Sequence, residues 1–107
     1  MVRSLFIRTV AAAWLLAAGP AIAADAVTFQ LSFLPQGSDA AAYVGVQKGL
    51  YAAENLDVTI VAGRGSTDTL SKVATGVSDL GFVSFDIFLA SKSAGPVPAT
   101  AVMTFFT

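Results

Sequence analysis

The chain has 107 residues, a length that suggests a single domain. Its six basic and seven acidic residues give a net charge of −1, without the basic excess of a nucleic-acid-binding protein. Histidine and cysteine are both missing, which excludes an imidazole base, a thiolate nucleophile, a disulfide and a metal cluster of these residues. We therefore expect a binding protein rather than an enzyme, with no metal and no cofactor.

Residues 1–23 have the three-part pattern of a cleavable secretory signal peptide. Arg3 and Arg8 provide the positive start, residues 10–18 an unbroken apolar run, and residues 21–23 an Ala-x-Ala cleavage site. The apolar run is too short for a transmembrane helix, which needs about 20 residues. Because no cysteine can carry a lipid anchor, we expect the mature protein to be free in the periplasm.

The first elements of the mature chain are a strand and a helix. Residues 27–33 alternate between apolar and polar side chains, which predicts a β-strand with Gln30 on its polar face. A turn follows over 34–38, and Ser38 or Asp39 can cap a helix over 40–48. Gly49 and residues 50–54 are expected to end that helix and to add a further short turn.

The same pattern then repeats. Residues 57–62 predict a second strand, residues 63–65 a loop, and residues 69–75 a helix that Ser66 or Thr67 could cap. A third strand over 80–83, a helix over 85–93 and a fourth strand over 100–106 complete the series. This β-α-β-α-β-α-β order with short connections predicts right-handed crossovers and an α/β fold with a parallel, doubly wound sheet.

The last predicted strand reaches Thr107 without a helix or a polar tail after it. Its apolar run would suit the inside of a sheet better than a terminus. We therefore expect residues 24–107 to be a truncated, partial ligand-binding lobe. Such a piece would have poor stability alone, because a small chain buries too little surface.

The candidate binding residues lie in three loops. In an open parallel sheet, ligands bind beyond the carboxyl ends of the strands. Residues 34–39, 63–67 and 84–86 follow those ends, and each loop opens a helix whose free N–H groups and positive dipole end favour acceptor or anionic ligand groups.

The loop from Gly63 to Ser66 is the most suggestive of the three. Its two glycines would let the backbone approach a ligand closely, and Ser66 and Thr67 offer hydroxyl groups. The alternative is an ordinary strand-to-helix turn. A third glycine, as in a dinucleotide fingerprint, and the Gly-Lys-Ser/Thr of a P-loop are both missing here.

Aromatic and acidic residues flank the same loops. Phe33, Tyr43 and Phe85 could stack on a flat ligand, although core packing is the alternative and is favoured for Phe33. Asp39 and Asp86 stand at predicted helix N-termini, where capping is the default explanation.

Several motifs occur in a set order along the chain. They are Phe33-x-Pro35 with Asp39 and Tyr43, then Gln47-Lys48-Gly49-Leu50-Tyr51, Asn55-Leu56-Asp57-Val58, Gly65-Ser66 and Gly76-x-x-Asp79-x-Gly81. This set, over residues 27–107, resembles the nitrate/sulfonate/taurine and thiamine-pyrimidine family of ABC transporter substrate-binding proteins. The resemblance implies the type II periplasmic binding fold, in which two α/β lobes trap a ligand, with this chain as the first part of the N-terminal lobe.

The resemblance also implies a site, partners and a function. The ligand contacts it implies are Phe33, Pro35, Asp39, Tyr43, Gly65, Ser66, Thr67, Ser84 and Asp86. The implied function is capture of a small molecule for the permease and ATPase of an ABC importer, by a protein that is monomeric at full length. A pyrimidine-precursor synthase of the same fold and a ligand-sensing module remain the alternatives.

The identity of the ligand stays open at this stage. The thiamine-pyrimidine branch usually has Trp at Phe33 and His at Asp39, so both departures count against an aminopyrimidine. Asn55 replaces a usual glycine, a mild change because Asn tolerates the left-handed conformation. Arg64 would suit an anionic ligand, whereas Asp39 and Asp86 would suit an amino or amidine group.

Overall fold

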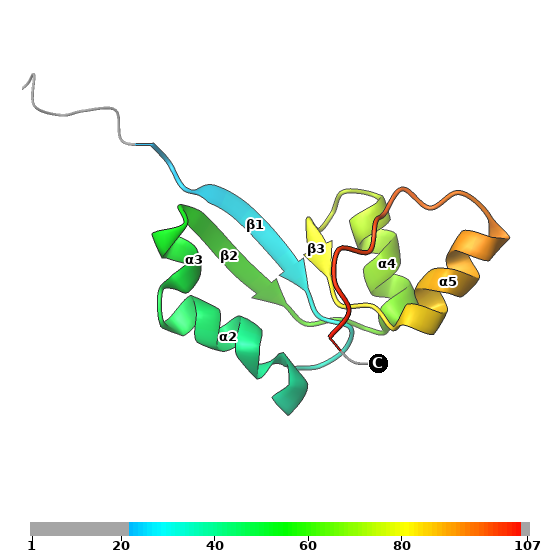
Figure 1. Cartoon of the computed structure of the whole chain (residues 1–107), viewed down its shortest axis with the longest axis horizontal. Helices are drawn as coiled ribbons and strands as arrows, with labels where there is room; N and C mark the ends of the chain where they lie inside the picture. Colours follow the sequence, from blue (N-terminus) through cyan, green and yellow to red (C-terminus); the bar gives the residue numbers. More distant parts are fainter. Residues whose placement is uncertain (1–21, 106–107) are drawn as a thin grey trace, which may run out of the picture.

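The computed structural model describes residues 22–105 (Figure 1). Almost all of the predicted signal peptide, 1–23, and the last residue of the predicted strand 100–106 lie outside this range. The elements are β1 (Asp25–Gln30), η1 (Gly37–Asp39), α2 (Ala40–Gln47), α3 (Leu50–Ala53), β2 (Leu56–Val61), α4 (Ser66–Ala74), β3 (Leu80–Gly81) and α5 (Phe85–Ala94). Within residues 22–105 no helix combines the length and apolar character that crossing a membrane requires.

The three strands form one parallel sheet in the order β2-β1-β3. Asp25 pairs with Leu56 at the start of β1, and Gln30 pairs with both Val61 and Gly81 at its end. The predicted parallel α/β class is therefore confirmed.

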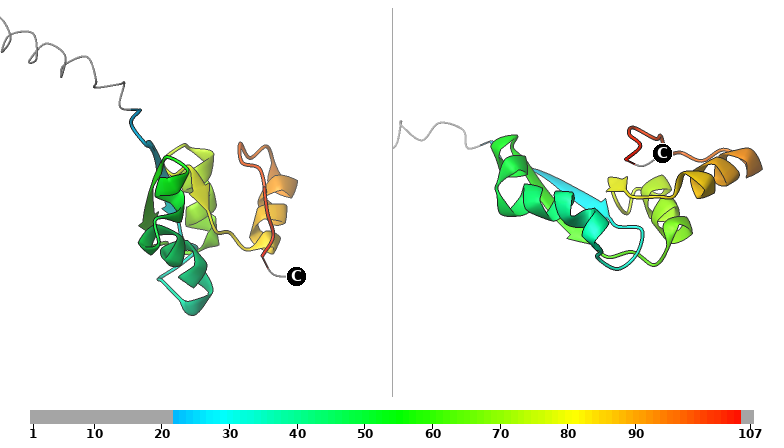
Figure 2. Two further views of the ribbon diagram at one scale, coloured as in Figure 1. Left: turned by 60° about the vertical axis from the view of Figure 1, so that its left-hand side comes forward. Right: turned by 60° about the horizontal axis from the view of Figure 1, so that its bottom comes forward.

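The order of the strands also fixes where the helices lie. The chain moves from β1 outward to β2 and then back past β1 to β3, so right-handed crossovers place α2 with α3 on one face and α4 on the other. In both further views α2 and α3 lie beside β2, while α4 packs on β3 and leads to α5 (Figure 2). The sheet is doubly wound, as predicted.

The buried residues gather at the carboxyl end of β1. Within residues 22–105 the buried apolar side chains are Leu31, directly after β1, Ala42 on α2 and Leu70 on α4. Gln30, which the alternating pattern placed on the polar face of the strand, is 2% exposed. The polar face is buried here because β1 is the central strand, and helices cover both of its faces.

Polar side chains hydrogen-bond β1 to the segment after β2 and to the turn before β3. Nε2 of Gln30 donates to the carbonyl of Ala62 at 2.7 Å, and Ser78 Oγ donates to Gln30 Oε1 at 3.3 Å. Asp79 donates its N–H to the carbonyl of Thr28 and accepts the Thr28 N–H on Oδ2 at 2.8 Å. Asp79 thus closes the turn before β3 and extends the pairing of that short strand.

The predicted fourth strand does not form over the described part of 100–106. Residues 100–105 have no ladder hydrogen bonds, and Val102 and Met103 are largely exposed. The segment instead passes beside β3, where the Phe105 ring meets Phe82 edge to face at 5.2 Å. An apolar, β-branched run favours a strand, but a strand also needs a neighbouring edge to bond to, and this segment pairs with none in the described chain.

Candidate functional site

The strand order reverses beside β1, and this reversal marks a crevice. Because β2 and β3 lie on opposite sides of β1, the chain segments that leave β1 and β3 diverge at the carboxyl edge of the sheet. Such a point is where open α/β sheets bind their ligands. The loops after all three strands meet at this edge, as expected from the sequence.

The loop after β2 is tied to the loop after β1 through its two glycines. Gly65 donates its N–H to the carbonyl of Ser32 at 2.7 Å, and Gly63 donates to that of Phe33 at 2.9 Å. A Cβ on Gly63 would collide with the backbone of Leu31 and Ser32, and Gly65 has a φ of +123°. Both glycines are therefore needed to pack one loop against the other.

Two serines join the N-termini of α4 and α5. Ser66 Oγ accepts the N–H of Ser84 at 3.0 Å and lies 3.0 Å from Ser84 Oγ. Ser66 is the first residue of α4, with Gly65 as its N-cap, and Ser84 is the N-cap of α5. The link brings two sets of free helical N–H groups to the carboxyl edge of the sheet.

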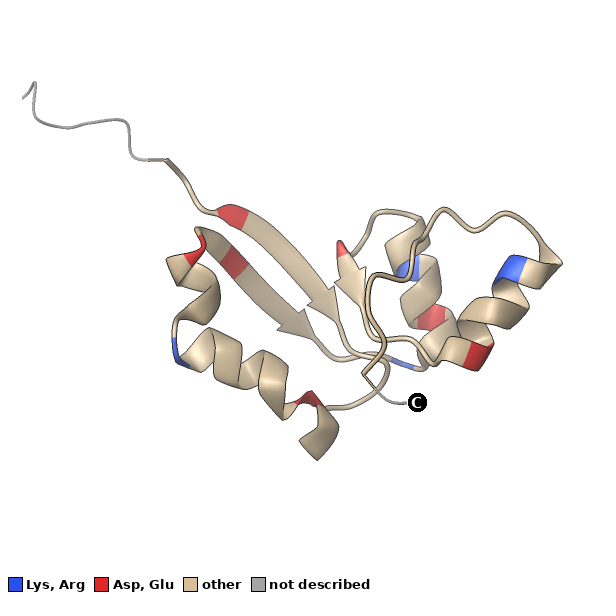
Figure 3. Ribbon diagram, in the orientation of Figure 1, with Lys and Arg blue, Asp and Glu red and all other residues tan. Residues whose placement is uncertain are grey.

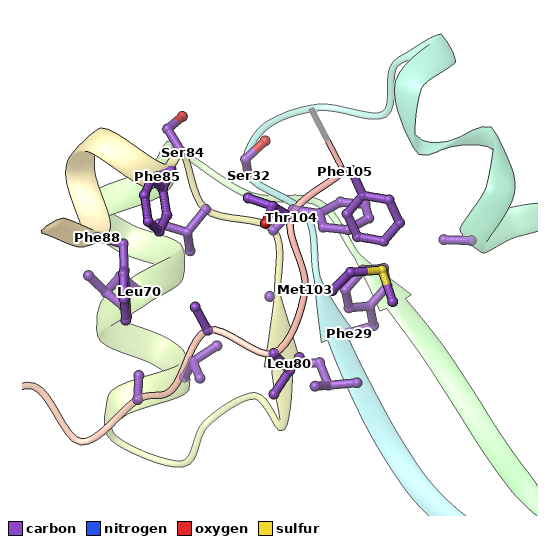
Figure 4. A pocket seen from close by; sticks show the side chains of 18 of the residues that line it. Phe29, Ser32, Leu70, Leu80, Ser84, Phe85, Phe88, Met103, Thr104 and Phe105 are labelled. Carbon is purple, nitrogen blue, oxygen red and sulfur yellow. The ribbon is translucent and has the colours of Figure 1, made fainter. Parts of the chain in front are cut away.

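A cavity of about 640 Å³ opens beside these helix ends. It is lined by residues of β1, β3, α4, α5 and the segment 99–105, and also of η1, α2 and α3, and most of its lining is apolar. In Figure 4, Leu70, Phe85 and Phe88 face it from the helices, and Phe29, Met103 and Phe105 lie across from them. Its size and its few polar groups are those of a small-molecule site.

Two of the nine predicted ligand-binding residues line the cavity. Asp39 and Ser84 line it, and Ser66 is linked to it through Ser84. The predicted residues that do not line it are Phe33, Pro35, Tyr43, Gly65, Ser66, Thr67 and Asp86.

Most of the remaining predicted residues lie on the surface. Phe33, which the sequence favoured as a core residue, is 50% exposed, because β1 ends at Gln30 and the chain bends away before Phe33. Pro35, Thr67 and Asp86 are exposed as well, and Tyr43 is half-buried on α2.

Several lining residues were not predicted from the sequence. Phe88 stacks on Phe85 with ring centroids 6.3 Å apart, and the three-residue spacing on one helix could have revealed the pair. Tyr51 also lines the cavity, and its ring packs on the bare backbone of Gly45. Nothing local to the sequence marks Ser32 or Met103, since their positions depend on how distant segments meet.

Figure 3 shows where the charged residues lie along the ribbon, and few of them belong to the lining of the cavity. Asp39 and Asp79 are its charged lining residues, and no Lys or Arg of the described chain lines it. Asp39 is 7% exposed, and its Oδ2 accepts the N–H of Gln36 at 2.9 Å. Arg64, the cation in the glycine loop, is exposed and lies outside the lining.

Comparison with known proteins found one family. The family model described as NMT1/THI5 like matches residues 37–107, which is more than half of the chain. The match begins at η1 and includes β2, β3, α4 and α5 together with the segment that closes the cavity. Searches of curated proteins and of solved structures found no match.

Proposed function

We propose, since this chain belongs to the NMT1/THI5-like family, that it is a solute-binding component of an ABC import system. It would capture a small organic molecule and deliver it to a membrane permease that an ATPase drives. The family covers ABC substrate-binding proteins for nitrate, sulfonates and taurine as well as thiamine-precursor proteins.

The observation that supports binding is the cavity at the carboxyl edge of the sheet. Aromatic and aliphatic side chains make up most of its wall, and Ser84 and Asp39 add polar groups at the end where α2 and α5 begin. An apolar wall gives affinity by losing water, and a few fixed polar groups give orientation. This combination supports reversible capture.

Transport by such a protein depends on a change of shape. A ligand that contacts two lobes favours the closed arrangement over the open one, and the closed form is what a permease would recognise. Under this proposal the cavity is one wall of the cleft. The leader-like pattern of residues 1–23 and the lack of cysteine support a periplasmic location without a lipid anchor.

A binding assay with a cavity-filling variant tests the proposal. We expect isothermal titration calorimetry and thermal shift to detect binding of one or more members of a panel of sulfonates, taurine, nitrate, small carboxylates, amines and pyrimidines. Ala101→Phe adds a ring to an exposed residue that lines the cavity, and it should weaken that binding at least about tenfold.

Ala90→Phe is the matched control, because Ala90 is exposed on α5 and does not line the cavity. Its affinity should stay within about twofold of the unmodified protein. If no member of the panel binds, or if both variants bind equally well, the proposed function is wrong. A covalent product formed from a bound pyrimidine precursor would instead favour the synthase.

A further inference from the structure

We propose that residues 99–105, which we call the strap, form a movable wall of the cavity, and that Lys92 holds this wall in place. Small molecules then enter and leave the cavity when the strap swings out. As far as ligands are concerned, this inference rests on the proposed function, and it adds a step that controls how fast they exchange.

The strap is a continuous part of the cavity wall. All seven of its residues line the cavity. It follows α5 and returns beside β3 toward the carboxyl edge of the sheet (Figure 1). In Figure 4, Met103 and Phe105 of the strap lie across the cavity from Phe85 and Phe88. A displacement of the strap would therefore open the cavity along one side.

The backbone of the strap is weakly attached to the rest of the molecule. Within residues 22–105, no backbone hydrogen bond joins 100–105 to another segment, and Ala99 bonds only to the nearby carbonyl of Val97 at 2.8 Å. The six residues from 100 to 105 are all exposed. A segment with so few backbone bonds and so little burial opens at low cost, unlike the sheet and the helices beside it.

The chain before the strap is suited to act as a hinge. Helix α5 ends at Ala94, and Pro96 and Pro98 follow within four residues. Because proline has no N–H, neither residue can continue the helix or donate to a neighbouring strand. Residues just beyond the end of an element are where proteins take up the backbone rotation of a swinging segment.

Two side-chain contacts hold the strap in this structure, one near each end. Lys92 Nζ donates to the carbonyl of Val97 at 2.7 Å, and the same ammonium lies 5.6 Å from the centroid of the Phe88 ring. At the other end, Phe105 meets Phe82 edge to face at 5.2 Å. Contacts of this kind at an exposed position are individually weak, so they hold the strap reversibly.

A ligand in the cavity would favour the closed strap. Val102, Met103 and Phe105 are apolar, yet they are 81%, 68% and 58% exposed. A small molecule between these side chains and the facing helices would remove part of their apolar surface from water. Because the molecule contacts the strap only in the closed position, its binding shifts the strap toward that position.

Thiol labelling tests the movement without a ligand. The chain has no cysteine, so Val73→Cys introduces a single thiol, at a half-buried residue of α4 that lines the cavity. In this background Lys92→Met removes the ammonium but keeps an unbranched stem, and it should raise the rate of reaction with 5,5′-dithiobis(2-nitrobenzoate) at least about threefold. Lys48→Met removes the same charge from the end of α2, outside the lining, and should change the rate less than about 1.5-fold.

A second variant and a stability measurement complete the labelling test. Phe105→Leu keeps an apolar side chain but loses the edge-to-face contact with Phe82, so it should also raise the rate. Thermal unfolding followed by circular dichroism gives the melting temperature of each variant. Equal labelling rates in Lys92→Met and Lys48→Met would overturn the inference. So would rates that simply follow the melting temperature, because the thiol would then be reached by global unfolding.

Exchange kinetics distinguish a movable wall from a lost contact. Stopped-flow fluorescence with 8-anilinonaphthalene-1-sulfonate, which fluoresces in apolar surroundings, measures entry and release. A movable wall limits both steps, so Lys92→Met should raise the association and dissociation rate constants together, whereas loss of a contact raises mainly dissociation. A change in dissociation alone, or no binding of this probe, would contradict the movable wall.

The outcomes separate the two proposals. If labelling and probe exchange respond to Lys92→Met but no member of the wider panel binds, the proposed function fails and the movable wall stands. If a member of the panel binds but neither rate responds to Lys92→Met, the inference is overturned while the proposed function stands.

Discussion

Asn55 shows how much a single residue can reveal before the structure is known. It has a φ of +60°, the one positive value among the described residues other than glycine. From the sequence, Asn55 was expected to tolerate the left-handed backbone conformation, and that prediction is confirmed. Gly49 was likewise predicted to end a helix, and its φ is +67°. Both could be predicted because the conformation depends on the residue itself.

Gln30 and Phe33 show the opposite case. The alternating pattern placed one on a polar face and the other in the core, and the structure buries the first and exposes the second. Burial depends on which elements cover a strand and where the strand ends. Neither fact is contained in a local pattern of seven residues.

Gly63 carries a prediction at the residue scale. Gly63→Ala would push a methyl group into the backbone of Leu31 and Ser32, which cannot rotate away as a side chain can. We expect the free energy of unfolding to fall by about 1–3 kcal/mol, measured by urea denaturation. Gly37→Ala is the control, because a Cβ there meets nothing within 4 Å. A smaller loss for Gly63→Ala than for the control would contradict the close approach.

At the scale of elements, the helices were easier to predict than the strands. Helices α4 and α5 lie within a few residues of the predicted ranges, since their glycines, serines and apolar spacing are local signals. β3 has two residues, and the predicted strand 100–106 is absent as far as residue 105. A strand exists only where a partner edge is available, and the chain segment alone does not specify that edge.

Thr69 carries a prediction for the attachment of α4 to the sheet. It is fully buried, and its Oγ1 donates to the carbonyl of Leu31 at 2.8 Å. Thr69→Val has the same shape but removes the donor, so it should lower the free energy of unfolding by about 1–3 kcal/mol in thermal or urea unfolding. Thr67→Val, on the exposed side of the same helix, should change it by less than about 0.5 kcal/mol. If Thr69→Val and Thr67→Val lowered the free energy of unfolding equally, the buried hydrogen bond would not stabilise the packing of α4 on the sheet.

For the whole molecule, the location of the candidate binding site could be predicted from the sequence better than the residues that line it. The carboxyl ends of parallel strands must meet at one edge, so the three loops could be placed together from their order alone. Yet Tyr51, Phe88 and Met103 reach the cavity from segments far apart in the chain. Their convergence depends on the packing of helices and on the path of residues 99–105, which no motif specifies.

The uneven distribution of buried residues predicts uneven protection from hydrogen exchange. Buried side chains cluster around the end of β1 and on α4, whereas α5 has none. We expect the amides of residues 28–31 and 69–73 to exchange slowest and those of α5 fastest among the helices of eight or more residues. Binding of a ligand should slow exchange at residues 84–88. Protection of α5 equal to that of β1 in the free protein would contradict this distribution.

The central position of β1 has a consequence for the order in which the molecule assembles. Each of its strand partners lies in the later half of the chain, from Leu56 to Val61 on one side and at Leu80 and Gly81 on the other. During synthesis, β1 therefore leaves the ribosome well before it has anything to pair with. Helices α2 and α3 can form early from local contacts, but the sheet must wait for distant segments, and such non-local pairing is slow. For that interval β1 is a bare strand with both edges open, available to any chaperone that recognises extended apolar chain.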